Sequence, residues 1–177
     1  MKIQAPISKS MLNEIKSGDF LYISGTIYTA RDAAHKKLVE LINLNKELPF
    51  DLKGAIIYYS GPSPASPGNI VGSIGPTTSY RMDKYTPDLL KQGLSVVIGK
   101  GKRSKEVIDS LVEYKAIYCA AYGGAGAYLA SKINSIIPVA FEELGPEAIY
   151  KLEVEDFPVI VVNDLWGNDL YESRGKI

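Results

Sequence analysis

Residues 72–83 read GSIGPTTSYRMD, and we expect the rest of the chain to be organised around this stretch. A short apolar strand predicted for residues 69–74 leads into a glycine–proline turn and then into a helix start. Thr77 and Thr78 are residue types that cap helices, and Arg81 falls about one turn later. Hydroxyls, unpaired backbone N–H groups and a guanidinium can therefore converge on one small anion, for which we expect a carboxylate.

Two further strand-to-helix junctions carry cations. On its own, the central stretch indicates no more than a capped helix with a surface arginine. However, residues 29–37 read TARDAAHKK and residues 98–104 read IGKGKRS, which adds Arg31 and Lys100. Three cationic junctions in one chain favour a shared binding site over three unrelated helix starts.

Length and charge limit the classes of protein to consider. The 177 residues are 46% hydrophobic and 23% charged, which suits one globular domain spanning residues 1–177. Twenty basic and twenty acidic residues cancel, so no overall field attracts nucleic acid or an anionic membrane. Any attraction for an anion must come from local clusters of cations.

Neither a membrane span nor a metal centre is expected in this chain. No apolar run approaches the roughly 20 residues that cross a bilayer, and the N-terminus lacks the apolar core of a signal peptide, so we expect a cytoplasmic protein. A single cysteine, Cys119, excludes an internal disulfide framework and cannot alone hold zinc or an iron–sulfur cluster. Its surroundings, AIYCAA, favour a small apolar residue on a buried strand over a reactive thiol.

Helices and strands alternate through the first three-quarters of the chain. The expected elements are a short helix within 8–16, a strand over 20–28 interrupted at Gly25, a helix capped by Asp32, a strand over 52–59, a proline-rich loop over 60–68, a helix over 86–93, a strand over 94–98, a helix from Ser104, a strand over 116–121 and a helix opened by residues 123–126, which read GGAG. Residues 123–126 (GGAG) lack the third glycine of the dinucleotide-binding motif, and residues 99–101 (GKG) lack the spacing of a Walker motif, which argues against nucleotide binding.

The last quarter differs in character. Strands are predicted over 138–141, 149–154 and 159–163, separated by turn-like residues that include 155–158, and residues 166–168 resemble a hairpin turn before residues 170–171. Antiparallel pairing there, after the alternating part, predicts an α/β fold with a mixed sheet flanked by helices.

With these junctions in place, the sequence resembles the β subunit, equivalently the C-terminal domain, of the class I iron–sulfur hydro-lyases. This is the family of fumarate hydratase and L(+)-tartrate dehydratase. The matching motifs span nearly the whole chain and are Gly25-Thr26, Arg31-Asp32-Ala33-Ala34-His35-Lys36, Gly61-Pro62, Gly75-Pro76-Thr77-Thr78, Arg81-Met82-Asp83, Gly99-Lys100-Gly101 and Asp156-Phe157-Pro158. Their combination is specific, although no single motif is.

The resemblance implies a fold, a partner and a cofactor. The fold is a swivelling β/β/α domain that closes over a separate α subunit, with two copies of each chain expected in the assembly. The α subunit holds a [4Fe-4S] cluster through three cysteines, and Cys119 matches none of those ligands. An exposed apolar or tyrosine-rich face is expected for this partner.

The resemblance also assigns roles to four residues. Arg31, Arg81 and Lys100 bind the dicarboxylate substrate, which agrees with the planar fork of arginine and the point charge of lysine. Thr77 lies at the position of proton transfer and also contacts substrate. Because a threonine hydroxyl is not basic near neutral pH, an N-cap role that includes a hydrogen bond to substrate is an equal alternative.

His35 is a second candidate for proton transfer, because only its side chain has an ordinary pKa near neutrality. It falls one turn into the helix after Arg31. We therefore favour a role in orienting Arg31 or Asp32.

Three functional hypotheses follow. The preferred one is the reversible hydration of fumarate to (S)-malate, with this chain supplying the carboxylate clamp. The second keeps the fold and takes tartrate or a related hydroxy-dicarboxylate. The third is a dicarboxylate-binding module without catalysis, which would not need Thr77 and Lys100 in addition to two arginines.

Overall fold

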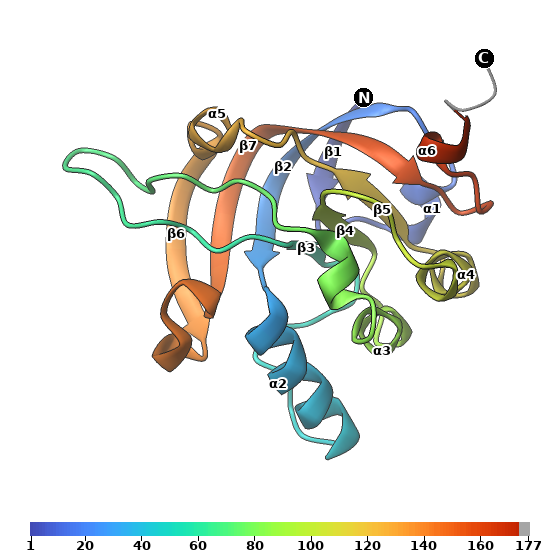
Figure 1. Cartoon of the computed structure of the whole chain (residues 1–177), viewed down its shortest axis with the longest axis horizontal. Coiled ribbons are helices and arrows are strands. Elements are labelled where there is room, and N and C mark those ends of the chain that lie inside the picture. Colours follow the sequence, from blue (N-terminus) through green and yellow to red (C-terminus); the bar gives the residue numbers. More distant parts are fainter. Residues whose placement is uncertain (174–177) are drawn as a thin grey trace.

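The computed structural model describes residues 1–173 and is built on a mixed sheet (Figure 1). Its strands are β1 (Lys2–Ala5), β2 (Phe20–Thr29), β3 (Ile56–Tyr58), β4 (Val96–Gly99), β5 (Ile117–Ala120), β6 (Ile133–Ala140) and β7 (Ile149–Asn163). Their order is β1-β2-β3-β4-β5-β7-β6, and β2 also pairs with β7. β1 to β5 are parallel neighbours, whereas β7 is antiparallel to β2, β5 and β6. The predicted mixed sheet is confirmed.

The strand β7 closes the sheet on itself. Because it pairs with both β5 and β2, the strands β2, β3, β4, β5 and β7 form a continuous ring. Closure needs bent strands, and the β2–β7 register shifts between Ile23 and Gly25, where Gly25 has a φ of 100°.

The prediction of two separate strands in this region was wrong. β7 runs through residues 155–158 without a break: Phe157 pairs with Ile23, and Pro158 pairs with Tyr22. The turn-like residues form a bulge instead, in which Asp156 has a φ of 48° and its N–H donates to the Ser24 hydroxyl at 3.1 Å.

Side chains of the three short parallel strands alternate between two cores. Ile56, Ile98 and Cys119 belong to the cluster inside the ring, and Ile57 and Val97 belong to the cluster outside it. Both faces of these strands are thus buried, which explains their continuous apolar sequence. The buried strand position predicted for Cys119 is confirmed.

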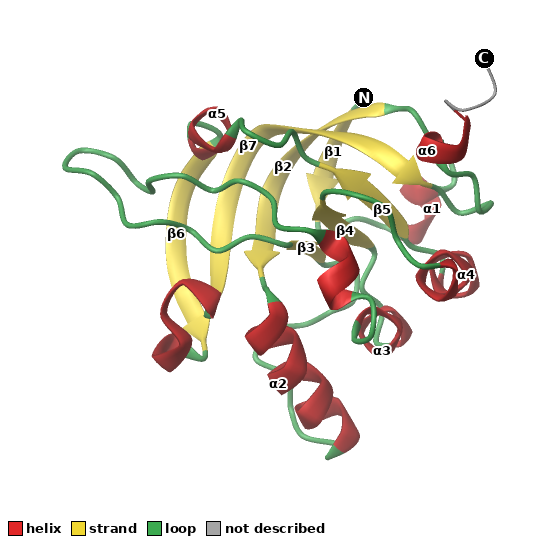
Figure 2. Ribbon diagram, in the orientation of Figure 1, coloured by secondary structure: helices red, strands yellow, loops and turns green. Residues whose placement is uncertain are grey.

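Helices flank the ring of strands. They are α1 (Lys9–Leu12), α2 (Asp32–Asn43), α3 (Thr86–Lys91), α4 (Lys105–Tyr114), α5 (Gly126–Ala130) and α6 (Leu170–Ser173), with the 3-10 helices η1 (Ser79–Met82) and η2 (Glu142–Glu147). Figure 2 shows α2, α3 and α4 along one side of the sheet. Leu38, Leu89 and Leu111 from these helices pack against the outward residues of β3 and β4. No helix of residues 1–173 is long and apolar enough to cross a membrane.

The predicted helix starts at two serines are confirmed. Ser8 accepts a hydrogen bond from the Met11 N–H at the start of α1, and Ser104 accepts one from the Val107 N–H at the start of α4. Each serine satisfies a backbone donor that would otherwise have no partner in the first helical turn.

The strand predicted for residues 69–74 is absent. Residues 61–74 form a long projecting arm, visible in teal to green beyond β6 in Figure 1. Its two limbs are joined by a few backbone hydrogen bonds, including the one from the Ser63 N–H to the Ser73 carbonyl at 2.9 Å. Three prolines in the outgoing limb remove donors, so no regular ladder forms.

The predicted turn near the C-terminus is present, but no strand follows it. The Asp164 carboxylate accepts from the N–H groups of Trp166 and Asn168, both at 3.0 Å. A single bridge then joins Asn163 to Asp169, after which the chain enters α6.

Candidate active site

The cationic junctions meet at the carboxyl ends of β2, β3 and β4. The register places Thr29, Tyr58 and Ile98 at one level of these parallel strands. Arg31 and Lys100 each lie two residues beyond that level. The carboxyl edge of parallel strands is where α/β folds bind ligands, since loops from several strands converge there.

Arg31 occupies the N-cap position of α2, but its side chain does not cap the helix. The prediction that Asp32 is the cap was wrong, because Asp32 is already the first helical residue. The Arg31 Nε lies 3.8 Å from the Glu147 Oε1, and this buried donor has no hydrogen bond among residues 1–173. A half-buried guanidinium with an unused donor is suited to an anionic ligand.

Thr77 is hydrogen-bonded to the residue that follows β3. Its N–H donates to the Tyr59 carbonyl at 2.7 Å, and the Ser60 hydroxyl donates to the Gly75 carbonyl at 2.7 Å. The predicted helix is only the single turn η1, which Thr78 precedes without a side-chain cap bond. The N-cap role for Thr77 is therefore wrong, and its hydroxyl makes no hydrogen bond among the described residues.

Arg81 is tied to the start of α2. Its Nε donates to the Asp32 Oδ1 at 2.9 Å, while the guanidinium side chain stays 50% exposed. The other carboxylate oxygen, Oδ2, is buried without a partner in the described part of the chain. Asp32 therefore brings Arg81 to the start of α2, next to Arg31.

Lys100 is joined to the same segment through the backbone. Thr78 and Lys100 form a parallel bridge, and the Ser79 N–H donates to the Lys100 carbonyl at 2.9 Å. The Lys100 side chain is exposed, and within residues 1–173 its ammonium forms no ion pair. It remains available to an incoming anion.

His35 lies beneath this site and not in it. The side chain is fully buried, with its Nδ1 2.8 Å from the Arg31 carbonyl oxygen and its ring edge-on to Tyr59 at 5.1 Å. Burial lowers the pKa of His35 to about 4, although the bond to Arg31 opposes this. The imidazole is thus neutral near pH 7, and its contact is with the backbone at Arg31.

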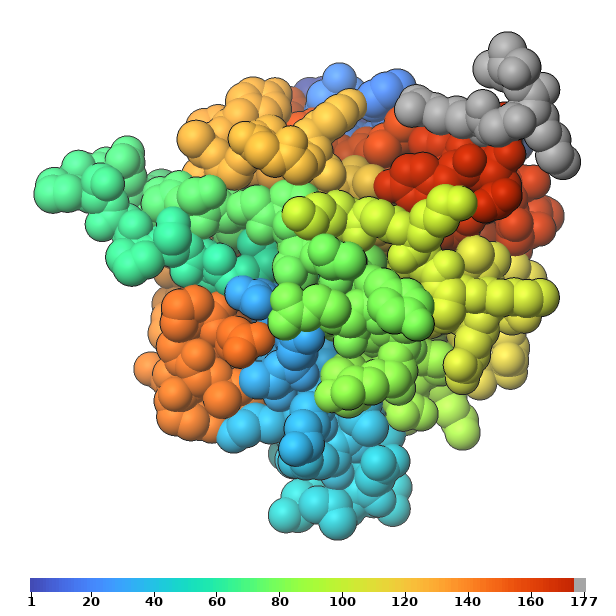
Figure 3. All heavy atoms as spheres, viewed as in Figure 1, coloured from blue at the N-terminus to red at the C-terminus, as the bar shows by residue number. Residues whose placement is uncertain are grey.

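The structure therefore groups Arg31, Thr77, Arg81 and Lys100 on one edge and leaves His35 below them. Figure 3 shows the corresponding segments adjoining on one face, with the start of α2 in blue, residues 75–85 in green and the residues after β4 in yellow-green. Two guanidinium groups, an ammonium and a hydroxyl form a set suited to a molecule with two carboxylates.

Several residues of this region had no predicted role. Asp83 and Arg103 stand in the quoted motifs, and a buried ion pair joins them, with Nε to Oδ1 at 2.7 Å. Ser79 and Tyr118 contact the backbone around Lys100. Their residue types give no signal in sequence, because only the fold determines which serine or tyrosine faces a loop.

Residues 1–173 offer no ligand set for an iron–sulfur cluster. Cys119 is fully buried on β5, and burial raises the pKa of its thiol. Among residues 1–173, no three His, Cys, Asp or Glu side chains are grouped to hold a metal. The residues present do not fit a [4Fe-4S] cluster.

A family model described as "Fumarase C-terminus" matches residues 1–174. This chain belongs to that family. The match agrees with the motifs around Arg31, Thr77 and Lys100, which lie together in the structure.

Individual relatives of the fumarase C-terminus family differ in length. The "Putative L(+)-tartrate dehydratase subunit beta" of Methanocaldococcus jannaschii is 42% identical over 176 residues, covering 96% of this chain and 90% of the relative. "Fumarate hydratase class I, anaerobic" of Escherichia coli is 45% identical over 156 residues, covering 86% of this chain and 28% of the relative. "Fumarate hydratase 2" of Leishmania major is 40% identical, and 31% of it is covered. The chain thus spans less than a third of these two fumarate hydratases.

Proposed function

We propose that this chain is the β subunit of a class I hydro-lyase and supplies the clamp for a dicarboxylate substrate. The preferred reaction is the reversible hydration of fumarate to (S)-malate. The observation that carries the proposal is the bond between Arg81 and Asp32, because it brings a guanidinium from η1 beside Arg31 at the start of α2.

Each residue of the clamp has a chemical role. The two guanidinium groups can each bind a carboxylate in a planar, two-point contact. Lys100 provides a compact positive charge for the negative charge that develops when a proton leaves the carbon next to a carboxylate. The Thr77 hydroxyl can pass that proton if cationic neighbours stabilise its alkoxide form.

The remaining part of the enzyme belongs to a partner chain. The fumarate hydratases matched here are about three times as long as this chain, since it covers 28% and 31% of them. We infer that an α subunit corresponds to their remaining part and holds the [4Fe-4S] cluster. A swivelling closure onto this partner and an assembly with two copies of each chain are part of the proposal.

Tartrate is the second candidate substrate. The relative of matching length, of which this chain covers 90%, is named as a tartrate dehydratase β subunit. A substrate panel on the complex of both subunits distinguishes the two reactions. Faster turnover of tartrate than of malate would reverse the preference, and dicarboxylate binding with no turnover of either would favour the non-catalytic module.

Replacing Arg81 by lysine tests the clamp. Arg81→Lys keeps the charge and loses the planar fork, so we expect kcat/KM of the assembled complex to fall by roughly tenfold to a hundredfold. Lys84→Ala is the control, because it removes an exposed cation close by whose ammonium lies over the Tyr85 ring. Full activity of Arg81→Lys would remove this arginine from the clamp.

A further inference from the structure

A single buried residue holds the backbone on both sides of Lys100. The Lys100 N–H donates to the Ser79 Oγ at 3.0 Å, and the Ser79 N–H donates to the Lys100 carbonyl at 2.9 Å. Ser79 is fully buried. The backbone that carries the exposed ammonium is therefore fixed to the first residue of η1.

A glycine makes this close approach possible. A Cβ built on Gly99 would lie 2.0 Å from the Ser79 Oγ and 2.9 Å from the ring of Tyr59. Any side chain at position 99 would push Ser79 away from Lys100. The glycine is thus required by space, and not by an unusual φ angle.

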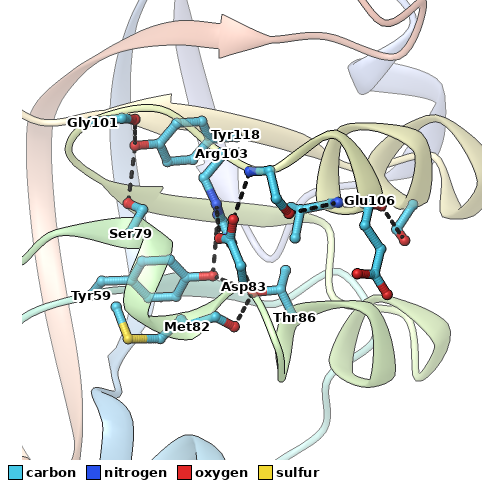
Figure 4. A network of polar contacts seen from close by, with 12 residues as sticks. Tyr59, Ser79, Met82, Asp83, Thr86, Gly101, Arg103, Glu106 and Tyr118 are labelled. Carbon is cyan, nitrogen blue, oxygen red and sulfur yellow. Dashed lines mark hydrogen bonds and ion pairs between the residues drawn. The ribbon is translucent and has the colours of Figure 1, made fainter.

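Tyr118 completes the hydrogen bonds of Ser79. The Tyr118 hydroxyl donates to the Gly101 carbonyl at 2.8 Å and lies 3.0 Å from the Ser79 Oγ (Figure 4). Since the phenol hydrogen goes to Gly101, the Ser79 hydroxyl donates to the Tyr118 oxygen and accepts from the Lys100 N–H. Every donor in this buried series of hydrogen bonds has an acceptor.

The ion pair of Arg103 and Asp83 holds this arrangement in place. The Arg103 guanidinium lies over the Tyr118 ring at 4.9 Å, and its Nε donates to the Asp83 Oδ1 at 2.7 Å. Asp83 is two residues after Arg81. The network of Figure 4 therefore links the loop of Lys100 to the segment of Arg81.

We propose that Ser79 and Tyr118 are positioning residues that fix the Lys100 backbone so that its ammonium points to the substrate. The inference rests on the proposed function, in which Lys100 binds the dicarboxylate. A lysine side chain has many rotamers, and fixing its backbone limits the positions that the ammonium can occupy. Neither positioning residue needs to touch the substrate.

The first test is Ser79→Ala in the assembled complex, assayed with malate. We expect kcat/KM to fall about tenfold. Ser110→Ala is the matched control, because the hydroxyl of this buried serine is also hydrogen-bonded to the backbone: it donates to the Glu106 carbonyl at 2.8 Å within α4. We expect the control to keep the activity of the unmodified complex. An unchanged kcat/KM in Ser79→Ala would overturn the proposal.

A double-mutant cycle separates positioning from simple stability. If Ser79 acts through Lys100, Ser79→Ala should cause little further loss in a Lys100→Ala background. An equal loss in both backgrounds would overturn the positioning role and leave the proposed function intact. Full activity of Lys100→Ala itself would overturn both, because Lys100 would then have no role in the clamp.

A measurement without turnover gives an independent check. In the full chain, Ser79→Ala and Tyr118→Phe should each speed hydrogen exchange of the Lys100 amide, whereas Ser110→Ala should not. Tyr118→Phe keeps the test open if Ser79→Ala fails to fold. Unchanged exchange at Lys100 in a folded variant would overturn the proposal.

Discussion

The position of the Arg31 side chain depends on the absence of a side chain at Gly61. A Cβ built on Gly61 would lie 2.7 Å from the Pro146 carbonyl oxygen and 3.2 Å from the Arg31 Cδ. Because the nearer neighbour is a backbone atom, an added methyl group must displace the backbone at Gly61 or at Pro146. The same methyl group also crowds the Arg31 side chain. Gly61 therefore provides the space in which the guanidinium lies.

Gly61→Ala should weaken substrate binding. We expect KM of the assembled complex for its dicarboxylate to rise about tenfold, because a shifted guanidinium loses its two-point contact. Gly123→Ala is the control, since no heavy atom lies within 4 Å of the Cβ it would add. An unchanged KM in Gly61→Ala would show that Arg31 tolerates the added group or does not bind substrate.

His35 should make the stability of the chain depend on pH. Its pKa is lowered from 6.5 to about 4 by burial, so the unfolded chain binds the proton more tightly than the folded chain. The free energy of unfolding should therefore decrease as pH falls from about 6.5 to about 4, by up to about 3 kcal/mol, and change little from this source at higher pH.

His35→Asn isolates this effect, because the chain has one histidine and asparagine does not titrate. Urea unfolding across this pH range should show a flatter curve for the variant, whatever its absolute stability. Parallel curves for the two proteins would contradict the assigned pKa. The same variant in the assembled complex tests His35 as a proton-transfer group.

The sequence indicates where the candidate site residues lie along the chain, but it does not indicate which residues contact them. Arg31, Thr77, Arg81 and Lys100 stand at predicted strand-to-helix junctions, and the sequence signals for such junctions are local. The contact between Arg31 and Glu147 is different, because the two residues are far apart in sequence and meet only once β7 has closed the ring. No pattern in the sequence predicts that contact.

At the scale of elements, the pair of Arg103 and Asp83 joins η1 and α3 to the start of α4. The side chains are 0% and 9% exposed, and the Asp83 Oδ2 also accepts from the Ser104 N–H at 2.6 Å. The Arg103 Nη2 donates to the Thr86 hydroxyl at 2.8 Å. Such a pair is costly to break, because the remaining charge stays buried.

Arg103→Met should lower the free energy of unfolding by about 3–5 kcal/mol, since it leaves the Asp83 carboxylate without its cation. The double variant Asp83→Asn with Arg103→Met should recover much of this loss, because asparagine keeps an acceptor for Ser104 and carries no charge. Urea unfolding measures both. A double variant as unstable as the single one would mean that the guanidinium stabilises the fold mainly through Tyr59, Thr86 and Tyr118.

Elements were predictable where one local signal dominates. The strands β3, β4 and β5 follow from short apolar runs, and α4 follows from its serine cap. β7 was divided wrongly, because residues 155–158 look like a turn in sequence, whereas pairing with β2 keeps them in the strand. Tertiary pairing decided the outcome against local propensity.

At the scale of the molecule, closure of the ring brings distant segments together. β2 lies near the N-terminus and β7 near the C-terminus, and their pairing extends from Phe20 with Ile160 to Thr29 with Tyr150. The mixed sheet was predictable from the two kinds of strand in the chain. The closure was not, because it depends on the bulge between β2 and β7, where Gly25 and Asp156 have positive φ angles.

The whole molecule has one cysteine, which is buried, and we therefore predict that this chain alone does not assemble an iron–sulfur cluster. Incubation with iron and sulfide under reducing conditions should leave the purified chain without the visible absorbance of a cluster, because its one thiol is buried and protonated. Addition of the α subunit should restore both absorbance and hydro-lyase activity. Cys119→Ala is the control and should give the same result in each step, since the thiol only fills space inside the ring. Iron bound in equal proportion to the unmodified chain and lost in Cys119→Ala would contradict the division of labour between the subunits.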